Sequence, residues 1–285
     1  MRRYKRVWVG LVMFLTVAIP LAAVADTGLR ILIVGSSTVL PVASRSAEKF
    51  MESSSSRILV NAGGSGVGIH SVAGGRADIG MASREISQDE SKRFEKAHLK
   101  IHTAGLDAVA CVVSAEIYQA GVRKLTPMQI AGIYMGKIRN WQEVGGPNRE
   151  IVVVDKERHR GTRHVFMQYV FGNASQRTLG THLVTGSNNE EQAKVAQSDS
   201  AIGMLSFNWT NDDVKAVSLL DQGKEISPTW ESVKRGSYPI VRKLNFITAG
   251  EPKGEIKAFI DFVKGPEGQR IVAESGYIPI GSFQP

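Results

Sequence analysis

The chain has 285 residues, of which 42% are hydrophobic and 22% charged, and its formal net charge is +8 at pH 7. This length exceeds that of one ordinary domain, so we expect two lobes, each with its own hydrophobic core. The basic residues are scattered, without interleaved aromatic residues, which argues against a nucleic-acid partner but allows a small anionic ligand. The single cysteine, Cys111, excludes an intrachain disulfide and is expected in a buried strand.

The first 25 residues have the pattern of an export signal. Four basic residues precede an apolar segment at 7–19, and the Ala-Val-Ala of residues 23–25 matches a cleavage site. The alternative is an uncleaved anchor, because residues 7–25 approach the roughly 20 apolar residues that span a bilayer. Pro20 favours cleavage after Ala25, which would remove four basic and no acidic residues and leave a net charge of +4. No cysteine directly follows the apolar segment, so we expect a soluble periplasmic protein without a lipid anchor.

Beyond the signal, apolar runs of strand length alternate with helical patterns. Strands are predicted at residues 30–34, 57–60, 77–81, 108–113, 151–154, 201–205 and 214–219, and helices at 43–51, 91–97, 127–135, 163–170, 190–196, 255–263 and 267–273. The alternation predicts an α/β fold of mainly parallel sheets with helices on both faces. Thr126 with Gln129, and Ser187 with Glu190, have the spacing of helix capping boxes, to which we assign no chemistry.

Three short loops follow predicted strands and precede helical patterns: residues 35–38 (Gly-Ser-Ser-Thr), 63–66 (Gly-Gly-Ser-Gly) and 160–162 (Arg-Gly-Thr). A helix N-terminus leaves amides unpaired and carries partial positive charge, so it attracts anions. One such loop is usually only a turn and a cap, whereas three that converge would form a strong oxyanion site. No flexible linker is evident, so we expect extended crossovers between the lobes and a ligand crevice at the carboxyl ends of the strands.

The loops carry few features of a nucleotide site. The second loop lacks the lysine of a Walker A motif and the spacing of a dinucleotide fingerprint.

The third loop extends from Lys156 to Arg163 and adds cationic side chains that can clamp an oxyanion through charge-assisted hydrogen bonds.

Seven separated segments resemble, in order and spacing, the phosphate-binding proteins of high-affinity phosphate ABC importers. They are residues 35–41 (GSSTVLP), 63–68 (GGSGVG), 77–85 (ADIGMASRE), 125–130 (LTPMQI), 136–141 (GKIRNW), 236–242 (GSYPIVR) and 276–280 (GYIPI). The resemblance implies a two-lobed periplasmic-binding-protein fold of type II, which closes on phosphate and delivers it to a membrane permease without covalent chemistry. Residues 26–107 and 237–285 would form lobe one, and residues 108–236 lobe two.

By this resemblance, phosphate oxygens would be held by Thr38, the amide of Val39, Ser65, Gly161 and Thr162. The full candidate set adds Ser37, Gly66, Ser83, Arg84, Asp107 and Arg160. No catalytic residue, metal ligand or cofactor is expected, and the partners would be inorganic phosphate and the ABC permease, with the protein itself a monomer.

The chain departs from the family pattern in the third loop. Relatives usually read Arg-x-x-Gly-Ser-Gly-Thr there, whereas this chain has Lys156 in place of the clamping arginine and Arg160 in place of a ligand serine. The sequence leaves open whether Arg160 reaches the ligand or points to solvent.

A second departure concerns the proton that phosphate carries at neutral pH. A phosphate site needs a carboxylate acceptor for it, which a sulfate site must avoid. The better-known branch has Asp after the serine of the third motif, but here Ser83 is followed by Arg84, so Asp107 and Glu85 become the candidate acceptors.

Three alternatives remain open at this stage. The site could serve another tetrahedral oxyanion such as sulfate, or a sensor without transport. It could also serve a periplasmic phosphoester hydrolase. The sequence has no G-x-S-x-G or H-E-x-x-H motif, and its six histidines show no ligand spacing, which disfavours an enzyme.

Overall fold

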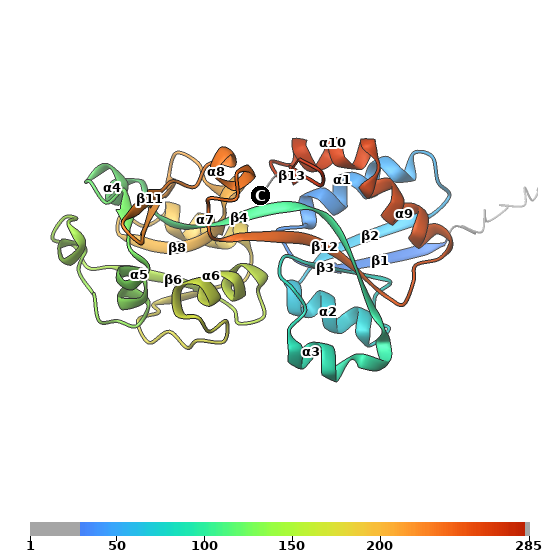
Figure 1. Cartoon of the computed structure of the whole chain (residues 1–285), viewed down its shortest axis with the longest axis horizontal. Coiled ribbons are helices and arrows are strands. Elements are labelled where there is room, and N and C mark those ends of the chain that lie inside the picture. Colours follow the sequence, from blue (N-terminus) through green and yellow to red (C-terminus); the bar gives the residue numbers. More distant parts are fainter. Residues whose placement is uncertain (1–28, 283–285) are drawn as a thin grey trace, which may run out of the picture.

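The computed structural model describes residues 29–282, so the predicted export signal and the first residues of predicted lobe one lie outside the described residues. Two α/β lobes lie side by side and are joined by two long strands, β4 and β12 (Figure 1). Lobe one is on the right of Figure 1 and lobe two on the left.

Lobe one contains β1 (Arg30–Gly35), α1 (Leu40–Met51), β2 (Arg57–Ala62), α2 (Ser65–Ala73), β3 (Ile79–Ala82), α3 (Gln88–Arg93), the short helix Glu95–Ala97, α9 (Gly254–Lys264) and α10 (Pro266–Glu274). Lobe two contains α4 (Ala115–Gln119), β5 (Lys124–Leu125), α5 (Pro127–Tyr134), the short helices Trp141–Val144 and Phe207–Trp209, β6 (Val152–Lys156), α6 (Gly161–Phe171), β7 (Leu183–Thr185), α7 (Asn188–Ala196), β8 (Ala201–Ser206), β9 (Val214–Ala216), β10 (Ser218–Asp221), β11 (Lys224–Ile226) and α8 (Trp230–Lys234). The crossing strands are β4 (Leu99–Ser114) and β12 (Val241–Ala249), and β13 (Ile278–Pro279) pairs with β4.

One sheet runs through both lobes in the order β2-β1-β3-β12-β4-β8-β6-β7. Within lobe one, β1 is parallel to β2 and β3, and within lobe two, β6 is parallel to β7 and β8, as the strand–helix alternation predicts. The crossing strands are antiparallel to each other and to β3 and β8, because one carries the chain out of lobe one and the other carries it back. The sheet is therefore mixed, and its antiparallel part is confined to the connection between the lobes and its neighbours.

The crossing strand β4 changes its partner near the junction of the lobes. Its first part, up to Ala108, pairs with β12, and Val109–Val113 pairs with β8. Asp107 and Arg242 stand directly opposite each other in the β4–β12 register. The sheet thus places one acidic and one basic residue together where both strands pass between the lobes.

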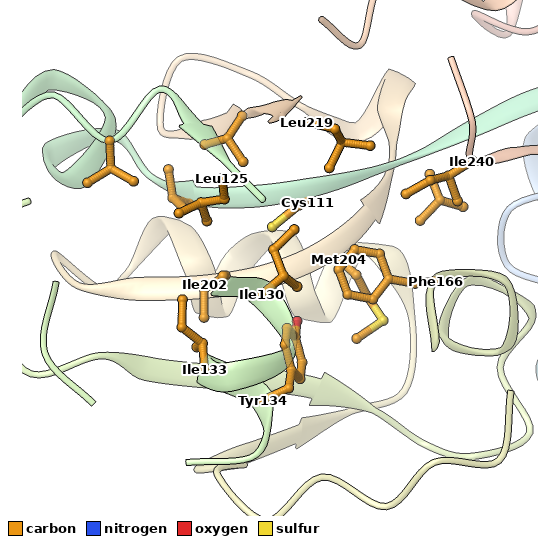
Figure 2. Packing of buried hydrophobic residues seen from close by; sticks show 14 of the residues in the cluster. Cys111, Leu125, Ile130, Ile133, Tyr134, Phe166, Ile202, Met204, Leu219 and Ile240 are labelled. Atoms are coloured by element: carbon orange, nitrogen blue, oxygen red, sulfur yellow. The ribbon is translucent and has the colours of Figure 1, made fainter. Parts of the chain in front are cut away.

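Each lobe has its own apolar core. In lobe one, Phe50, Phe246 and Phe259 pack edge to face beneath α1 and α9. In lobe two, the core includes Tyr134 and Phe166 and surrounds Cys111 (Figure 2). Cys111 is fully buried in β4, as predicted, and burial raises the pKa of its thiol well above the ordinary value, which leaves it unreactive.

Several elements differ from the sequence prediction. The helix expected at 91–97 begins earlier, because Ser87 and Glu90 form a complete capping box, and it breaks into α3 and a short 3-10 helix. The strand expected at 214–219 is divided at Val217, since β9 pairs with β4 while β10 joins a separate small sheet with β5 and β11. The predicted box at Thr126 is complete. Only half of the box at Ser187 forms: Ser187 Oγ accepts from the Glu190 amide, but the Glu190 carboxylate accepts from the Gly186 amide instead of the Ser187 amide. Among residues 29–282, the structure has no helix both long and apolar enough to cross a membrane.

Candidate anion-binding site

The three Gly/Ser/Thr loops meet between the lobes. The first precedes α1, the second begins α2, and the third begins α6, so two loops come from lobe one and one from lobe two. Thr38, Ser65 and Thr162 are each at most 3% exposed. The Gly66 amide donates to the His159 carbonyl at 3.0 Å, a direct hydrogen bond from lobe one to lobe two.

Serine hydroxyls build the lobe-one side of the site. Ser36 Oγ donates to Ser83 Oγ at 2.9 Å, and the Ser83 amide donates to Ser65 Oγ at 3.0 Å. Only glycine lets the first loop lie this close to β3. Gly35 has a φ of +145°, and a Cβ at this position would lie 2.2 Å from the Met81 carbonyl oxygen. These contacts fix the positions of the hydroxyl groups before any ligand arrives.

The N-terminus of α6 forms the lobe-two side. Arg160 is the N-cap, and no hydrogen bond within the described part of the chain engages the amides of Gly161 and Thr162. A Cβ on Gly161 would lie 2.3 Å from Ser65 Oγ and 2.6 Å from Ser83 Oγ. Glycine therefore permits the two lobes to touch here, and the helix end presents partial positive charge to the serine hydroxyls.

Arg242 lies at the centre of the site, although sequence reasoning did not select it. Its Nη1 donates to Thr162 Oγ1 at 2.9 Å, and its Nη2 donates to Thr38 Oγ1 at 3.1 Å. Asn188 at the start of α7, also missed, donates from Nδ2 to the same Thr38 oxygen at 3.0 Å. Thr38 Oγ1 therefore accepts two hydrogen bonds, which leaves its own hydrogen to be donated.

Both missed residues stand in segments that sequence reasoning singled out for other reasons. Arg242 ends the 236–242 motif, and Asn188 follows the capping serine of α7. The 236–242 motif and the capping serine of α7 were therefore the sequence features from which Arg242 and Asn188 could have been selected as site residues.

Asp107 is the carboxylate of the site. It is fully buried, and its Oδ2 accepts from Nε and Nη2 of Arg242 at 2.8 and 2.7 Å, while Oδ1 accepts from Ser206 Oγ. Burial raises the pKa of Asp107, and the bonds from Arg242 and Ser206 oppose that shift by stabilising the carboxylate. Glu85, the other candidate acceptor, is exposed and lies 3.6 Å from Lys243 Nζ, so only Asp107 belongs to this cluster.

The guanidinium groups of two candidate residues, Arg84 and Arg160, are bound to carboxylates outside the hydroxyl cluster. Arg84 forms a two-pronged pair with Glu90, both bonds being 2.7 Å. Arg160 donates from Nε and Nη2 to Glu157 Oε2 at 2.8 and 2.6 Å. Its side chain is 15% exposed and passes over Gly64. A Cβ at Gly64 would lie only 2.9 Å from Arg160 Cδ. Arg160 therefore covers the second loop and is not turned out to solvent.

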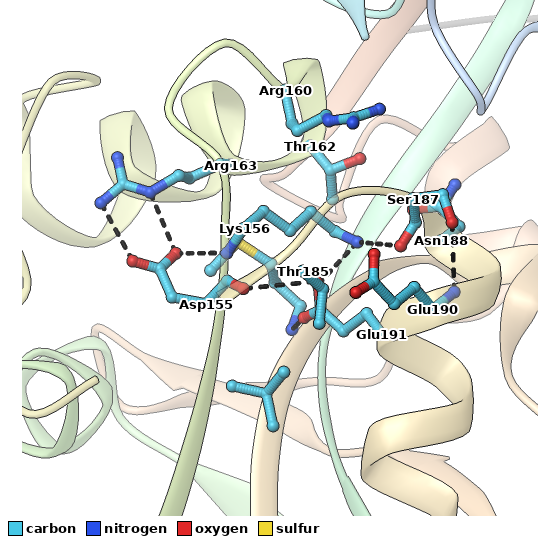
Figure 3. A network of polar contacts seen from close by, with 12 residues as sticks. Asp155, Lys156, Arg160, Thr162, Arg163, Thr185, Ser187, Asn188, Glu190 and Glu191 are labelled. Atoms are coloured by element: carbon cyan, nitrogen blue, oxygen red, sulfur yellow. Dashed lines mark hydrogen bonds and ion pairs between the residues drawn. The ribbon is translucent and has the colours of Figure 1, made fainter. Parts of the chain in front are cut away.

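Lys156, at the position of the clamping arginine of relatives, faces the interior of lobe two. Its Nζ lies 2.6 Å from Glu191 Oε2 and donates to the Ser187 carbonyl at 3.1 Å (Figure 3). Arg163 points to the opposite side and pairs with Asp155 (Figure 3). Neither side chain forms a hydrogen bond with Thr38 or Thr162 in the described structure.

The amides of two candidate residues have partners within the protein, and one candidate hydroxyl has none within residues 29–282. The amide of Val39 donates to the Ser36 carbonyl at 3.1 Å, and the amide of Gly66 donates to His159 as described above. Ser37 is half-buried, and its side chain makes no hydrogen bond within residues 29–282. No group of three or more His, Cys, Asp or Glu residues in that range could hold a metal ion.

The arrangement suits a small oxyanion. It combines hydroxyl donors from both lobes, free amides at a helix N-terminus, one guanidinium and one carboxylate, all shielded from water. Donors recognise anionic oxygens, and a carboxylate recognises an oxygen that still carries a proton.

Comparison with known proteins places the chain among binding proteins of this architecture. Residues 22–267 match the PBP superfamily domain. The phosphate-binding protein PstS of Bacillus subtilis is 33% identical over 248 residues, which are 86% of this chain and 79% of that protein. A Clostridium perfringens protein, described as a phosphate ABC transporter substrate-binding protein and solved with bound phosphate, has a TM-score of 0.79 and 34% identity over 88% of this chain and 99% of its own. An ABC-type phosphate transport receptor of Vibrio cholerae has a TM-score of 0.70 and 29% identity, covering 87% and 99%.

Proposed function

Because the chain belongs to the PstS family of phosphate-binding proteins, with the periplasmic-binding-protein fold predicted from its sequence, we propose that it captures inorganic phosphate between its lobes and delivers it to an ABC transporter permease. One observation carries this proposal. Buried hydroxyls of both lobes, on Thr38, Ser65 and Thr162, converge beside a single arginine–aspartate pair.

In the proposed complex, the hydroxyls of Thr38, Ser65 and Thr162 donate to phosphate oxygens. The unpaired amides at the start of α6, beginning with Gly161, add their dipoles. Closing the lobes removes water, which strengthens each electrostatic contact with the dianion. The closed shape then signals to the permease that the site is occupied.

Asp107 is the proposed acceptor for the phosphate proton. It is the carboxylate bonded to Arg242, and Arg242 in turn touches Thr38 and Thr162. A carboxylate in this position attracts monohydrogen phosphate and repels sulfate, which has no proton to donate.

The remaining assignments rest on the sequence of residues 1–25 and on the family. We propose export to the periplasm with cleavage after Ala25, a monomeric mature protein and a binding role without catalysis. The purified protein should accordingly show no turnover of a generic phosphoester.

Equilibrium titration tests the proposed function. Protein freed of bound anions by unfolding and refolding should bind inorganic phosphate, and sulfate should compete weakly between pH 6 and pH 8. Asp107→Asn should weaken phosphate binding more than sulfate binding, because it removes the proton acceptor. Sulfate that competes as well as phosphate would exclude the phosphate assignment.

A further inference from the structure

Arg242 is the basic residue that joins the two lobes at the site. It stands on crossing strand β12, its Nη2 bonds Thr38 of lobe one, and its Nη1 bonds Thr162 of lobe two. Building on the proposed function, we propose that Arg242 is the phosphate-binding guanidinium of this chain and couples phosphate binding to lobe closure.

The geometry of the guanidinium supports a direct contact with the ligand. Asp107 holds the group from one side through Nε and Nη2, so its plane is fixed. The remaining N–H groups point at the Thr38 and Thr162 hydroxyls, with a longer contact of 3.4 Å from Nη1 to the Ser83 carbonyl. The neutral hydroxyl oxygens are weaker acceptors than a phosphate dianion, so an anion between the lobes can take over these donors with a gain in bond strength.

The other basic residues around the loops are engaged differently. Lys156, Arg160 and Arg84 are bound to Glu191, Glu157 and Glu90, respectively. None of these three contacts the hydroxyls of both Thr38 and Thr162, whereas Arg242 contacts both. Arg242, on β12, is thus the basic residue placed to supply positive charge to an anion held by both threonines.

The position of Arg242 explains how binding would drive closure. Its Cα lies on a strand common to both lobes, and its two terminal nitrogens each reach one lobe. A ligand bonded to these nitrogens and to both threonines would stabilise only the closed arrangement. Removing the guanidinium should weaken phosphate binding and also shift the unliganded protein toward the open form.

The test compares Arg242→Gln and Arg242→Lys with a matched control, Arg163→Gln. Arg163 is also a buried guanidinium paired with an aspartate, but it lies inside lobe two and does not contact the hydroxyls. Phosphate affinity is measured by calorimetry, folding by thermal unfolding, and closure by small-angle X-ray scattering with and without phosphate. A crystal structure of the unsubstituted protein with phosphate completes the set.

We expect Arg242→Gln to weaken phosphate binding about 100-fold, which corresponds to about 2.7 kcal/mol. Arg242→Lys keeps the positive charge but loses the planar guanidinium with its several N–H donors, so phosphate affinity should fall about tenfold. Arg163→Gln should stay within about threefold and close normally on phosphate. Affinity of Arg242→Gln within threefold of the unsubstituted protein would overturn the inference.

A crystal structure of the unsubstituted protein with phosphate tests the contact between Arg242 and phosphate even if both Arg242 variants fail to fold. Phosphate with an oxygen within about 3.2 Å of Nη1 or Nη2 is expected, and bound phosphate that touches neither nitrogen would overturn the inference. Failure of the unsubstituted protein to bind phosphate at all would instead refute the proposed function.

Discussion

Substitution of Gly161 by alanine should block closure without harming the fold. Gly161 is the first residue of α6, and its φ is not in the left-handed region, so alanine can adopt its backbone conformation. In the closed structure the added Cβ would lie 2.3 Å from Ser65 Oγ and 2.6 Å from Ser83 Oγ. Both atoms belong to the opposite lobe, so the collision disappears when the lobes separate.

The expected loss of phosphate affinity in Gly161→Ala depends on whether the Ser65 side chain can move away from the added Cβ. Ser65 Oγ accepts the buried Ser83 amide at 3.0 Å, and rotating this side chain away would leave that amide without a partner. Overpacking of this kind costs about 1 to 3 kcal/mol, which corresponds to a loss of phosphate affinity of roughly 5- to 150-fold. The free energy of unfolding should change little, since each lobe keeps its own core.

Calorimetric titration with phosphate and urea unfolding measure these two quantities, and X-ray scattering with saturating phosphate reports closure. Gly74→Ala provides a control at the exposed end of α2, where the nearest atom to the new Cβ is the His70 carbonyl oxygen at 3.2 Å. Unchanged phosphate affinity in Gly161→Ala, with normal compaction, would refute the view that contact between the lobes at this glycine is needed for binding.

Three further predictions concern the threonines, the covering arginine and an acid-sensitive pair. Thr38→Ala and Thr162→Val each remove one hydroxyl bond to a charged ligand, so each should cost on the order of 1.5 to 3 kcal/mol of phosphate binding by calorimetry. Both variants should still fold, with a lower unfolding midpoint, because each leaves a buried donor of Arg242 without its acceptor. Arg160→Ser uncovers the second loop, and we expect faster phosphate release in stopped-flow measurements; slower release would argue against a covering role. Burial alone would raise the pKa of Glu90, but its bonds with Arg84 and Ser87 outweigh this and hold the pKa at about 2. Because the folded pKa lies below the ordinary 4.5, the stabilisation is present above pH 4.5 and is lost as the pH falls toward 2. Glu90→Gln should remove up to about 3 kcal/mol of the pH dependence that the free energy of unfolding, measured with urea, shows in this range, and an unchanged slope would contradict the assignment.

The local features of the site were accessible from the sequence. Gly/Ser/Thr loops between strands and helices have a physical reason to lie at helix N-termini, and the structure brings Thr38, Ser65 and Thr162 together. Their role as ligands stays a prediction. The helix α2 was missing from the predicted helices because its first turn contains Gly66 and Gly68, which have low helix propensity.

The choice of ionic partners was not accessible in the same way. Asp107 and Arg242 are 135 residues apart and meet only through the register of β4 and β12. Likewise, Lys156 turns away from the loops because a buried carboxylate on α7 stands beside it. Long-range register and tertiary neighbours decide these contacts: the 236–242 motif contains Arg242 but does not indicate which carboxylate it meets.

The paired crossing strands restrict how the molecule can move. Two single-stranded linkers would let the lobes tumble through many relative orientations, and each binding event would have to restrain them anew. Hydrogen bonds between β4 and β12 instead form a ribbon, interrupted by one irregularity between Leu244 and Asn245 that increases local twist and bending. Such a ribbon allows the lobes fewer relative orientations than two separate linkers would, so less entropy is lost when they come together around a very small ion.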